Sequence, residues 1–292
     1  MAPQAAYEAM EYGKGADGMP AERPYEIYDS HAHYDDAAFD EDRSWLLENT
    51  LPLGGVRCVI NMGTRIRSCA AAMGMADLNP YVFAAVGIHP EEIDGALPEN
   101  WVDCLRVWLE GGAVAVGEIG LDYHWKDSAP RDRQIQVFTA QLELANQMGF
   151  PVCVHDRDAH SDIMELLKMY RPQGVVHCFS GSVEMARSLV DMGMYIGIGG
   201  AVTFKNARRI VEVAKELPLD RLLLETDAPY MTPDPHRGTR NDSTYIPLVA
   251  EKIAQLRGET TESILEASNE NIRRLFRLDQ HSRRQAPVTH IY

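Results

Sequence analysis

Two histidines one residue apart are the first side chains whose types and spacing indicate chemistry. His31 and His33 lie in the segment YDSHAHYDD (28–36), directly after a short apolar run at 25–28. In a β-strand, side chains two residues apart point to the same side, so both imidazoles can face one point. Neutral imidazole is a common ligand of divalent metals. The segment predicts a metal site, although two solvated histidines in a polar turn would fit the same letters.

Further potential ligands and proton carriers follow later apolar runs. They are His89, Glu118, His155, His177 and Asp227. A single buried histidine or glutamate is more often a hydrogen-bonded core residue than a ligand. Because these residues all come at the ends of predicted strands, their shared position favours one common site.

The elements that must position these residues alternate regularly along the chain. Predicted strands cover 25–29, 56–63, 82–90, 113–120, 151–156, 174–179, 194–200 and 221–227. Helical periodicity predicts a helix at 131–149 with Gly149 as its C-cap, and another at 260–276 with Thr260 or Thr261 as its N-cap. Near-continuous apolar strands are typical of a sheet that is buried on both faces.

Eight strand–helix units in about 250 residues favour an α/β fold, a single-domain (β/α)8 TIM barrel with an extra C-terminal helix. The open doubly wound sheet is disfavoured because no glycine-rich phosphate-binding loop follows the first strand. Barrel enzymes carry their chemistry at the carboxyl ends of the strands. The predicted ligands therefore converge at one mouth of the barrel.

Composition sets the outer limits. The chain has 292 residues, of which 45% are hydrophobic and 24% charged, as in ordinary globular proteins. We expect the barrel at 25–278, a flexible tail at 1–24 that is not a signal peptide, and a C-terminal tail at 279–292. No apolar run has the ~20 residues of a membrane span. The five cysteines form no C-x-x-C pair, which predicts free thiols and a cytoplasmic location.

The net charge of −15 limits how a polyanion could bind. Proteins that hold nucleic acid on a broad basic face are usually basic. A nucleic-acid substrate would therefore have to be bound locally.

Taken together, the motifs resemble the TatD family of metal-dependent deoxyribonucleases, a branch of the amidohydrolase-like barrels. The matching segments are DSHAHYD (29–35), VGIHP (86–90), VGEIGLDY (116–123), VHDRDAH (154–160), HCFSG (177–181), LLLETDAPY (222–230), RGTRN (237–241) and NIRRLF (271–276). The chain departs from the family pattern at Tyr34, where leucine is common, and at Ser243, where proline is usual. The exchange at Ser243 is expected to loosen a substrate loop, and the N-terminal tail is an extra piece.

The resemblance implies a binuclear centre with two divalent ions per chain. His31, His33 and Asp227 would bind the first ion. His155 and His177 would bind the second, and Glu118 would bridge both, since a carboxylate can span ions about 3.5–4 Å apart. A hydroxide between the ions would attack phosphorus, and Asp227 would orient the water and take its proton. Histidine ligands favour zinc, manganese or iron, while magnesium stays open.

The resemblance also implies DNA as the substrate and removal of nucleotides from the 3′ end of single strands. His89 would contact a substrate phosphate or, equally well, make a hydrogen bond within the site. Arg157 and Arg240 would clamp phosphates, unless they form surface salt bridges. No membrane and no obligate protein partner are expected.

Two other functions stay open from the residues alone. The first is a metal-dependent ester or amide hydrolase on the same core, for example acting on aminoacyl-tRNA. Many amidohydrolases bridge their metals with a carbamylated lysine, and the predicted fourth and fifth strands contain no lysine. The second is a metal- or RNA-binding protein without activity, which the complete ligand set disfavours.

Overall fold

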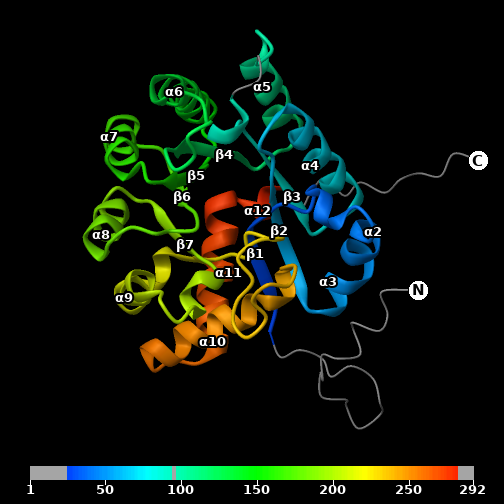
Figure 1. The fold of residues 1–292 in the computed structure, drawn as a ribbon. Helices are drawn as coiled ribbons and strands as arrows, with labels where there is room; N and C mark the ends of the chain where they lie inside the picture. Colours follow the sequence, from blue (N-terminus) through cyan, green and yellow to red (C-terminus); the bar gives the residue numbers. More distant parts are fainter. Residues whose placement is uncertain (1–24, 94–96, 282–292) are drawn as a thin grey trace, which may run out of the picture.

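Eight parallel strands in consecutive order form the centre of the molecule, as the alternating pattern predicts (Figure 1). The computed structural model describes residues 25–93 and 97–281. The strands are β1 (Ile27–Ala32), β2 (Val56–Met62), β3 (Val82–Val86), β4 (Ala115–Asp122), β5 (Val152–Arg157), β6 (Gly174–Val176), β7 (Tyr195–Ile198) and β8 (Leu222–Leu224). With the helices that lie between them, they form the predicted (β/α)8 TIM barrel.

Helices surround the strands (Figure 1). The longer ones are α4 (Ile66–Leu78), α5 (Trp101–Gly111), α6 (Arg131–Met148), α7 (His160–Tyr170), α8 (Val183–Asp191), α9 (Arg208–Glu216), α10 (Ile246–Arg257) and α11 (Thr261–Phe276). The shorter ones are η1 (Ala37–Phe39), α2 (Arg43–Trp45), η2 (Leu46–Thr50), α3 (Leu51–Leu53), η3 (Pro90–Glu92), η4 (Gly200–Thr203), η5 (Leu219–Arg221), η6 (Ser243–Tyr245) and α12 (Leu278–His281).

The two helices predicted from periodicity are confirmed, together with their caps. Helix α6 ends at Gly149, whose φ of 72° is the left-handed conformation that glycine adopts without strain. Helix α11 begins after Thr260, whose side chain accepts a hydrogen bond from the backbone N–H of Ser263.

Side chains help to close the barrel between its last and first strands. Backbone pairing there includes a parallel bridge between Ala32 and Ala228. Across the seam, the Ser30 hydroxyl of β1 donates to the Leu224 carbonyl of β8 (3.0 Å), while the Leu224 N–H donates to the Ser268 hydroxyl of α11 (2.8 Å). The seam between β8 and β1 is therefore held partly by buried side-chain hydrogen bonds.

Helix α11 covers the amino-terminal end of the barrel. Its Ile272 and Phe276 belong to an apolar cluster with strand residues such as Ile60 and Leu223. The Asn271 amide donates to the carbonyls of residues 219 and 222 at the start of β8. In Figure 1 this red helix lies across the middle of the strands. The opposite, carboxyl-terminal end is left for the functional site.

The predicted tails fall largely outside the described residues. This holds for residues 1–24 and for 282–292. Residues 279–281 of the predicted C-terminal tail belong to α12. No helix in the described part of the chain is long and apolar enough to cross a membrane.

Candidate metal centre

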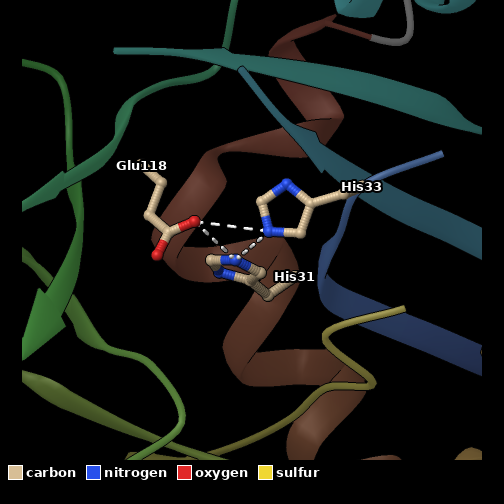
Figure 2. Close-up of side chains that lie close together, drawn as sticks. All are labelled: His31, His33 and Glu118. Atoms are coloured by element: carbon tan, nitrogen blue, oxygen red, sulfur yellow. Dashed lines mark hydrogen bonds and ion pairs between the residues drawn. The ribbon is translucent and has the colours of Figure 1, made fainter. Parts of the chain in front are cut away.

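The six predicted ligands come together at the carboxyl ends of the strands. His31 lies in β1, Glu118 in β4 and His155 in β5, while His33, His177 and Asp227 lie just beyond β1, β6 and β8. Figure 2 shows His31, His33 and Glu118 pointing toward one another from β1 and β4. The Nε2 atoms of His31 and His33 are 3.1 Å apart, so the two imidazoles do face one point.

Glu118 is the centre of this cluster, and its two oxygens face different histidines. Oε2 lies 3.3 Å from Nε2 of both His31 and His33. Oε1 lies 2.8 Å from Nε2 of His177 and 3.0 Å from Nδ1 of His155. One buried carboxylate therefore connects two pairs of imidazoles.

Asp227 approaches the first pair from β8. Its Oδ1 lies 3.4 Å from Nε2 of His33 and 3.8 Å from Nε2 of His31. The residue has a φ of 60°, a left-handed conformation that is uncommon for a residue other than glycine. Its backbone N–H donates to the His31 carbonyl (2.9 Å), which holds the turn and aims the carboxylate at the histidines.

In His33 and His155, a hydrogen bond to the ring nitrogen that points away from the cluster determines which nitrogen carries the proton. Nδ1 of His33 lies 3.3 Å from the Met62 carbonyl, which can only accept, so Nδ1 carries the proton. Nε2 of His155 lies 3.0 Å from Oδ2 of Asp122, which fixes the proton on Nε2. When neutral, these rings direct the lone pairs of His33 Nε2 and His155 Nδ1 into the cluster, as metal ligands require.

His89 has the opposite arrangement. Its Nδ1 accepts a hydrogen bond from the backbone N–H of Glu91 (3.2 Å), so the neutral ring carries its proton on Nε2. Nε2 lies 3.3 Å from Oε1 of Glu118. His89 is therefore a hydrogen-bond donor toward the cluster, and this separates it from the four ligand-like histidines.

A second buried carboxylate, Glu225, lies beside His31 and His177. Potential ligand atoms of these three residues all lie within 4.8 Å of one another. Within the described residues, Nδ1 of each ring and Oε2 of Glu225 have no hydrogen-bond partner. A Cβ on Gly197 would lie 2.3 Å from Glu225 Oε2, so glycine is required to leave this carboxylate its space. Its position suits a group that orients ligand histidines.

The electrostatics of the cluster follow from burial and close charges. Burial opposes ionisation of Glu118, but His177, His89 and His31 outweigh it and hold its pKa well below the usual range. Burial disfavours the charged form of His155, yet Asp122 and Glu118 raise its pKa to about 10. Burial and the neighbouring His177 lower the pKa of His31 to about 4.

This donor set fits a divalent metal. Neutral imidazoles and carboxylates are the ligands that zinc, manganese and iron share. Three groups of potential ligands occur among the described residues, namely His31–His33–Glu118, His31–His177–Glu225 and His89–Glu118–His155. A cation would replace the protons that His33 and His155 otherwise hold and would neutralise a buried carboxylate.

The two departures from the family pattern contact each other. The buried Tyr34 hydroxyl accepts a hydrogen bond from the Ser243 N–H (2.8 Å) and lies 2.7 Å from the Ser243 hydroxyl. That hydroxyl donates to Oδ2 of Asp29 (2.7 Å), and Oδ1 of Asp29 accepts from the His31 N–H (3.2 Å). Ser243 is fully buried and anchors its loop to β1, which argues against the expected loosening of that loop.

The two predicted phosphate clamps have different surroundings. Arg240 forms two hydrogen bonds with the carboxylate of Asp42 (2.7 and 2.6 Å) and lies over the Phe39 ring. Its guanidinium is therefore engaged in the salt bridge that the sequence left open as the alternative. Arg157 is exposed at the end of β5 and lies 5.1 Å from the centre of the Trp125 ring.

Sequence reasoning missed Thr226. Its hydroxyl donates to Oδ2 of Asp29 (2.6 Å), and its N–H donates to Oδ1 (3.0 Å). Its position next to the predicted ligand Asp227 was a signal in the sequence. Its partner Asp29 is 197 residues away, so no local pattern connects the two residues.

Comparison with known proteins agrees with this geometry. The family model "TatD related DNase" matches residues 28–277. A metal-dependent hydrolase of Bacillus subtilis, YabD, is 40% identical over 256 residues, which cover 87% of this chain and 100% of that protein. A protein of a Rahnella species named "3′-5′ ssDNA/RNA exonuclease TatD" is 34% identical over 251 residues, covering 82% of this chain and 94% of its own length.

A solved structure shows the same arrangement of the chain. The TatD homologue YJJV from Escherichia coli K12 superposes with a TM-score of 0.80 at 33% identity, covering 86% of this chain and 98% of the homologue. Its likeness extends over the whole barrel, and the family match spans every predicted ligand of the cluster. The chain therefore belongs to the TatD-related DNase family and is a metal-dependent hydrolase.

Proposed function

We propose that this hydrolase cleaves phosphodiester bonds of single-stranded DNA from the 3′ end, with two divalent ions held on either side of Glu118. The observation that carries the proposal is the division of the histidines between the two oxygens of Glu118. His31, His33 and Asp227 would hold one ion, and His155 and His177 the other. The native ion would be zinc, manganese, iron or magnesium.

The bound ions, Asp227 and His89 would have different roles in the reaction. When bound, the ions supply an activated water and stabilise charge on the phosphoryl oxygens. Asp227 is the candidate base, because nearby histidines keep its pKa low despite burial, so that it stays ionised. His89 presents an N–H toward the cluster and would donate it to a phosphate oxygen.

Two arguments support a single strand as the substrate. Relatives are named 3′-5′ ssDNA/RNA exonucleases. The candidate ligands are also deeply buried, since His31 is fully buried and Glu118 is 3% exposed. A single strand end is more easily brought to such buried groups than an intact duplex, which must first be unpaired at a cost of a few kcal/mol. Five free cysteines fit a reducing cytoplasm as the place of action.

The test is a time course with metal-loaded protein on 5′-labelled single-stranded DNA, blunt duplex of the same sequence, RNA and aminoacyl-tRNA in parallel. We expect a ladder that shortens from the 3′ end and forms faster on the single strand than on the duplex. Early cuts in mid-chain would contradict the exonuclease. Hydrolysis of the aminoacyl ester with intact DNA would replace the phosphodiesterase by the ester hydrolase.

A further inference from the structure

A basic groove lies beside the metal centre. We define it by residues of three neighbouring segments, at 178–180 after β6, 201–210 from η4 to the start of α9, and 231–237 after β8. Its volume of about 850 Å³ is large enough for part of a polymeric ligand. Cys178, which lines the groove, follows the candidate ligand His177 in the sequence, so the groove lies next to the candidate site.

The charge of this groove is opposite to that of the whole chain. Four cations line it, Lys205, Arg208, Arg209 and Arg237, against a single acid, Asp234. The chain as a whole carries a net charge of −15. The groove therefore concentrates positive charge where an acidic protein would otherwise repel a polyanion.

These cations are also available for a ligand. No ion pair with an acid is found for any of the four among residues 25–93 and 97–281. Elsewhere arginines are paired, as Arg131 is with Asp162 and Arg257 is with Glu259. The guanidinium of Arg237 lies 3.7 Å from the centre of the Phe204 ring, which holds it at the groove without neutralising it.

We propose that the basic groove binds backbone phosphates of the nucleic-acid strand next to the bond that is cleaved. This inference rests on the proposed phosphodiesterase function and names the surface that holds its substrate. Lysine and arginine along a groove, with an aromatic ring beside them, are how single strands are bound without sequence preference. The net charge of −15 disfavours a broad basic face. These four cations would therefore supply most of the binding free energy outside the metal centre.

The experiment compares two charge-reversed pairs. The groove pair is Arg208→Glu with Arg209→Glu, in the first turn of α9, where the helix dipole favours acids and the fold should survive. The control pair is Lys168→Glu with Arg274→Glu, two exposed cations in the last turns of α7 and α11. Both pairs change the net charge equally, and thermal melting checks that all proteins are folded.

For the groove pair we expect KM on a long single strand to rise about tenfold or more, while kcat stays within about twofold. The slope of log KM against log salt should fall by about 0.7 for each phosphate that the groove no longer neutralises. A dinucleotide, which has no further phosphate to reach the groove, should be cleaved at the wild-type rate. An equal KM for the two pairs, or an unchanged salt slope, would overturn the proposal.

Binding is measured separately, by fluorescence anisotropy of a labelled, phosphorothioate-linked strand that resists cleavage. If wild-type protein cuts no nucleic acid but the groove pair alone weakens this binding, the phosphodiesterase fails and the groove stands. If wild-type protein cuts DNA and both pairs bind equally, the groove fails and the phosphodiesterase stands.

Discussion

The two ends of the barrel bury opposite kinds of side chain. At the amino-terminal end, α11 places Ile272 and Phe276 against apolar strand residues, and the polar Asn271 satisfies two backbone carbonyls. At the carboxyl-terminal end, His31, Glu118 and Glu225 are almost fully buried, and two of their polar atoms, Nδ1 of His31 and Oε2 of Glu225, have no hydrogen-bond partner within the described residues.

This difference separates stability from function. Burial of apolar surface stabilises the fold, whereas burial of ionisable groups without full pairing costs free energy. A buried ionisable group that destabilises the fold is expected to be retained only where it has a functional role. The contrast predicts that substitutions at the carboxyl-terminal end, the mouth of the barrel, reduce activity more than stability. Substitutions at the amino-terminal end should reduce stability more than activity.

The largest effect is expected at the mouth, from Asp227→Asn. The change keeps the shape but removes a negative ligand and the candidate base. Turnover should fall about 10²–10⁴-fold, while the melting temperature stays near that of the wild type. Initial rates at saturating substrate and thermal melting measure the two quantities. Asp191→Asn on the exposed surface of α8 is the matched control and should be neutral. A near-normal rate for Asp227→Asn would place the base elsewhere.

The reverse behaviour is expected from Phe276→Ala in α11. Phe276 is 1% exposed, and removing its ring leaves a cavity that costs about 3–5 kcal/mol of unfolding free energy. Denaturant unfolding measures this loss, and kcat per folded molecule should be unchanged. Phe276→Leu should cost clearly less. A fall in kcat without a loss of stability would break the contrast between the two ends.

Metal removal and pH test the role of the buried histidines at the mouth of the barrel. The pKa of His155 is raised to about 10, and that of His33 lies well above its ordinary value because Asp227 and Glu118 outweigh the effect of burial. Raised pKa values stabilise the stripped protein below about pH 6.5, and this contribution is lost as pH rises through the folded-state pKa.

A metal must displace these protons, so its affinity should rise with pH by about tenfold per unit for each proton released. The melting temperatures of loaded and stripped protein should therefore diverge from about pH 6 to about pH 8. Titration calorimetry in two buffers of different ionisation enthalpy counts the protons. No proton release, or a gap in melting temperature that narrows with pH, would contradict the assignment of His33 and His155 as ligands.

The smallest effect is expected just below the mouth, where Tyr34 and Ser243 join two loops. Tyr34→Phe and Ser243→Ala should each cost about 1–3 kcal/mol of unfolding free energy, because each leaves a buried polar partner unsatisfied. The double variant should cost less than the sum, since the two side chains share one network. Tyr170→Phe, which loses only an exposed hydrogen bond to Glu143, is the control. Strictly additive losses would show that the pair does not act together.

Much of the barrel could be predicted from the sequence because strand and helix patterns are local. The apolar run at 56–63 indicates a strand buried on both faces, and the helical periodicity at 131–149 indicates a helix buried on one side. Both elements are found within one residue of these limits, at 56–62 and 131–148. The ligand-like residues could be identified for a similar reason, since strand ends are recognisable along the chain. Strand limits were less accurate: β1 continues through His31 to Ala32, and β8 ends at Leu224, before Glu225 and Asp227.

Contacts between distant segments were decided only by the tertiary structure. Which histidines face which oxygen of Glu118, the proton on Nε2 of His89, and the pairing of Arg240 with Asp42 all depend on neighbours that no local pattern specifies. Tyr34 and Ser243 are 209 residues apart in the sequence, yet they share one buried hydrogen bond. The sequence by itself therefore determined which chemical groups reach the mouth. The closing of the barrel determined their distances and protonation, because these depend on side chains brought together from different strands.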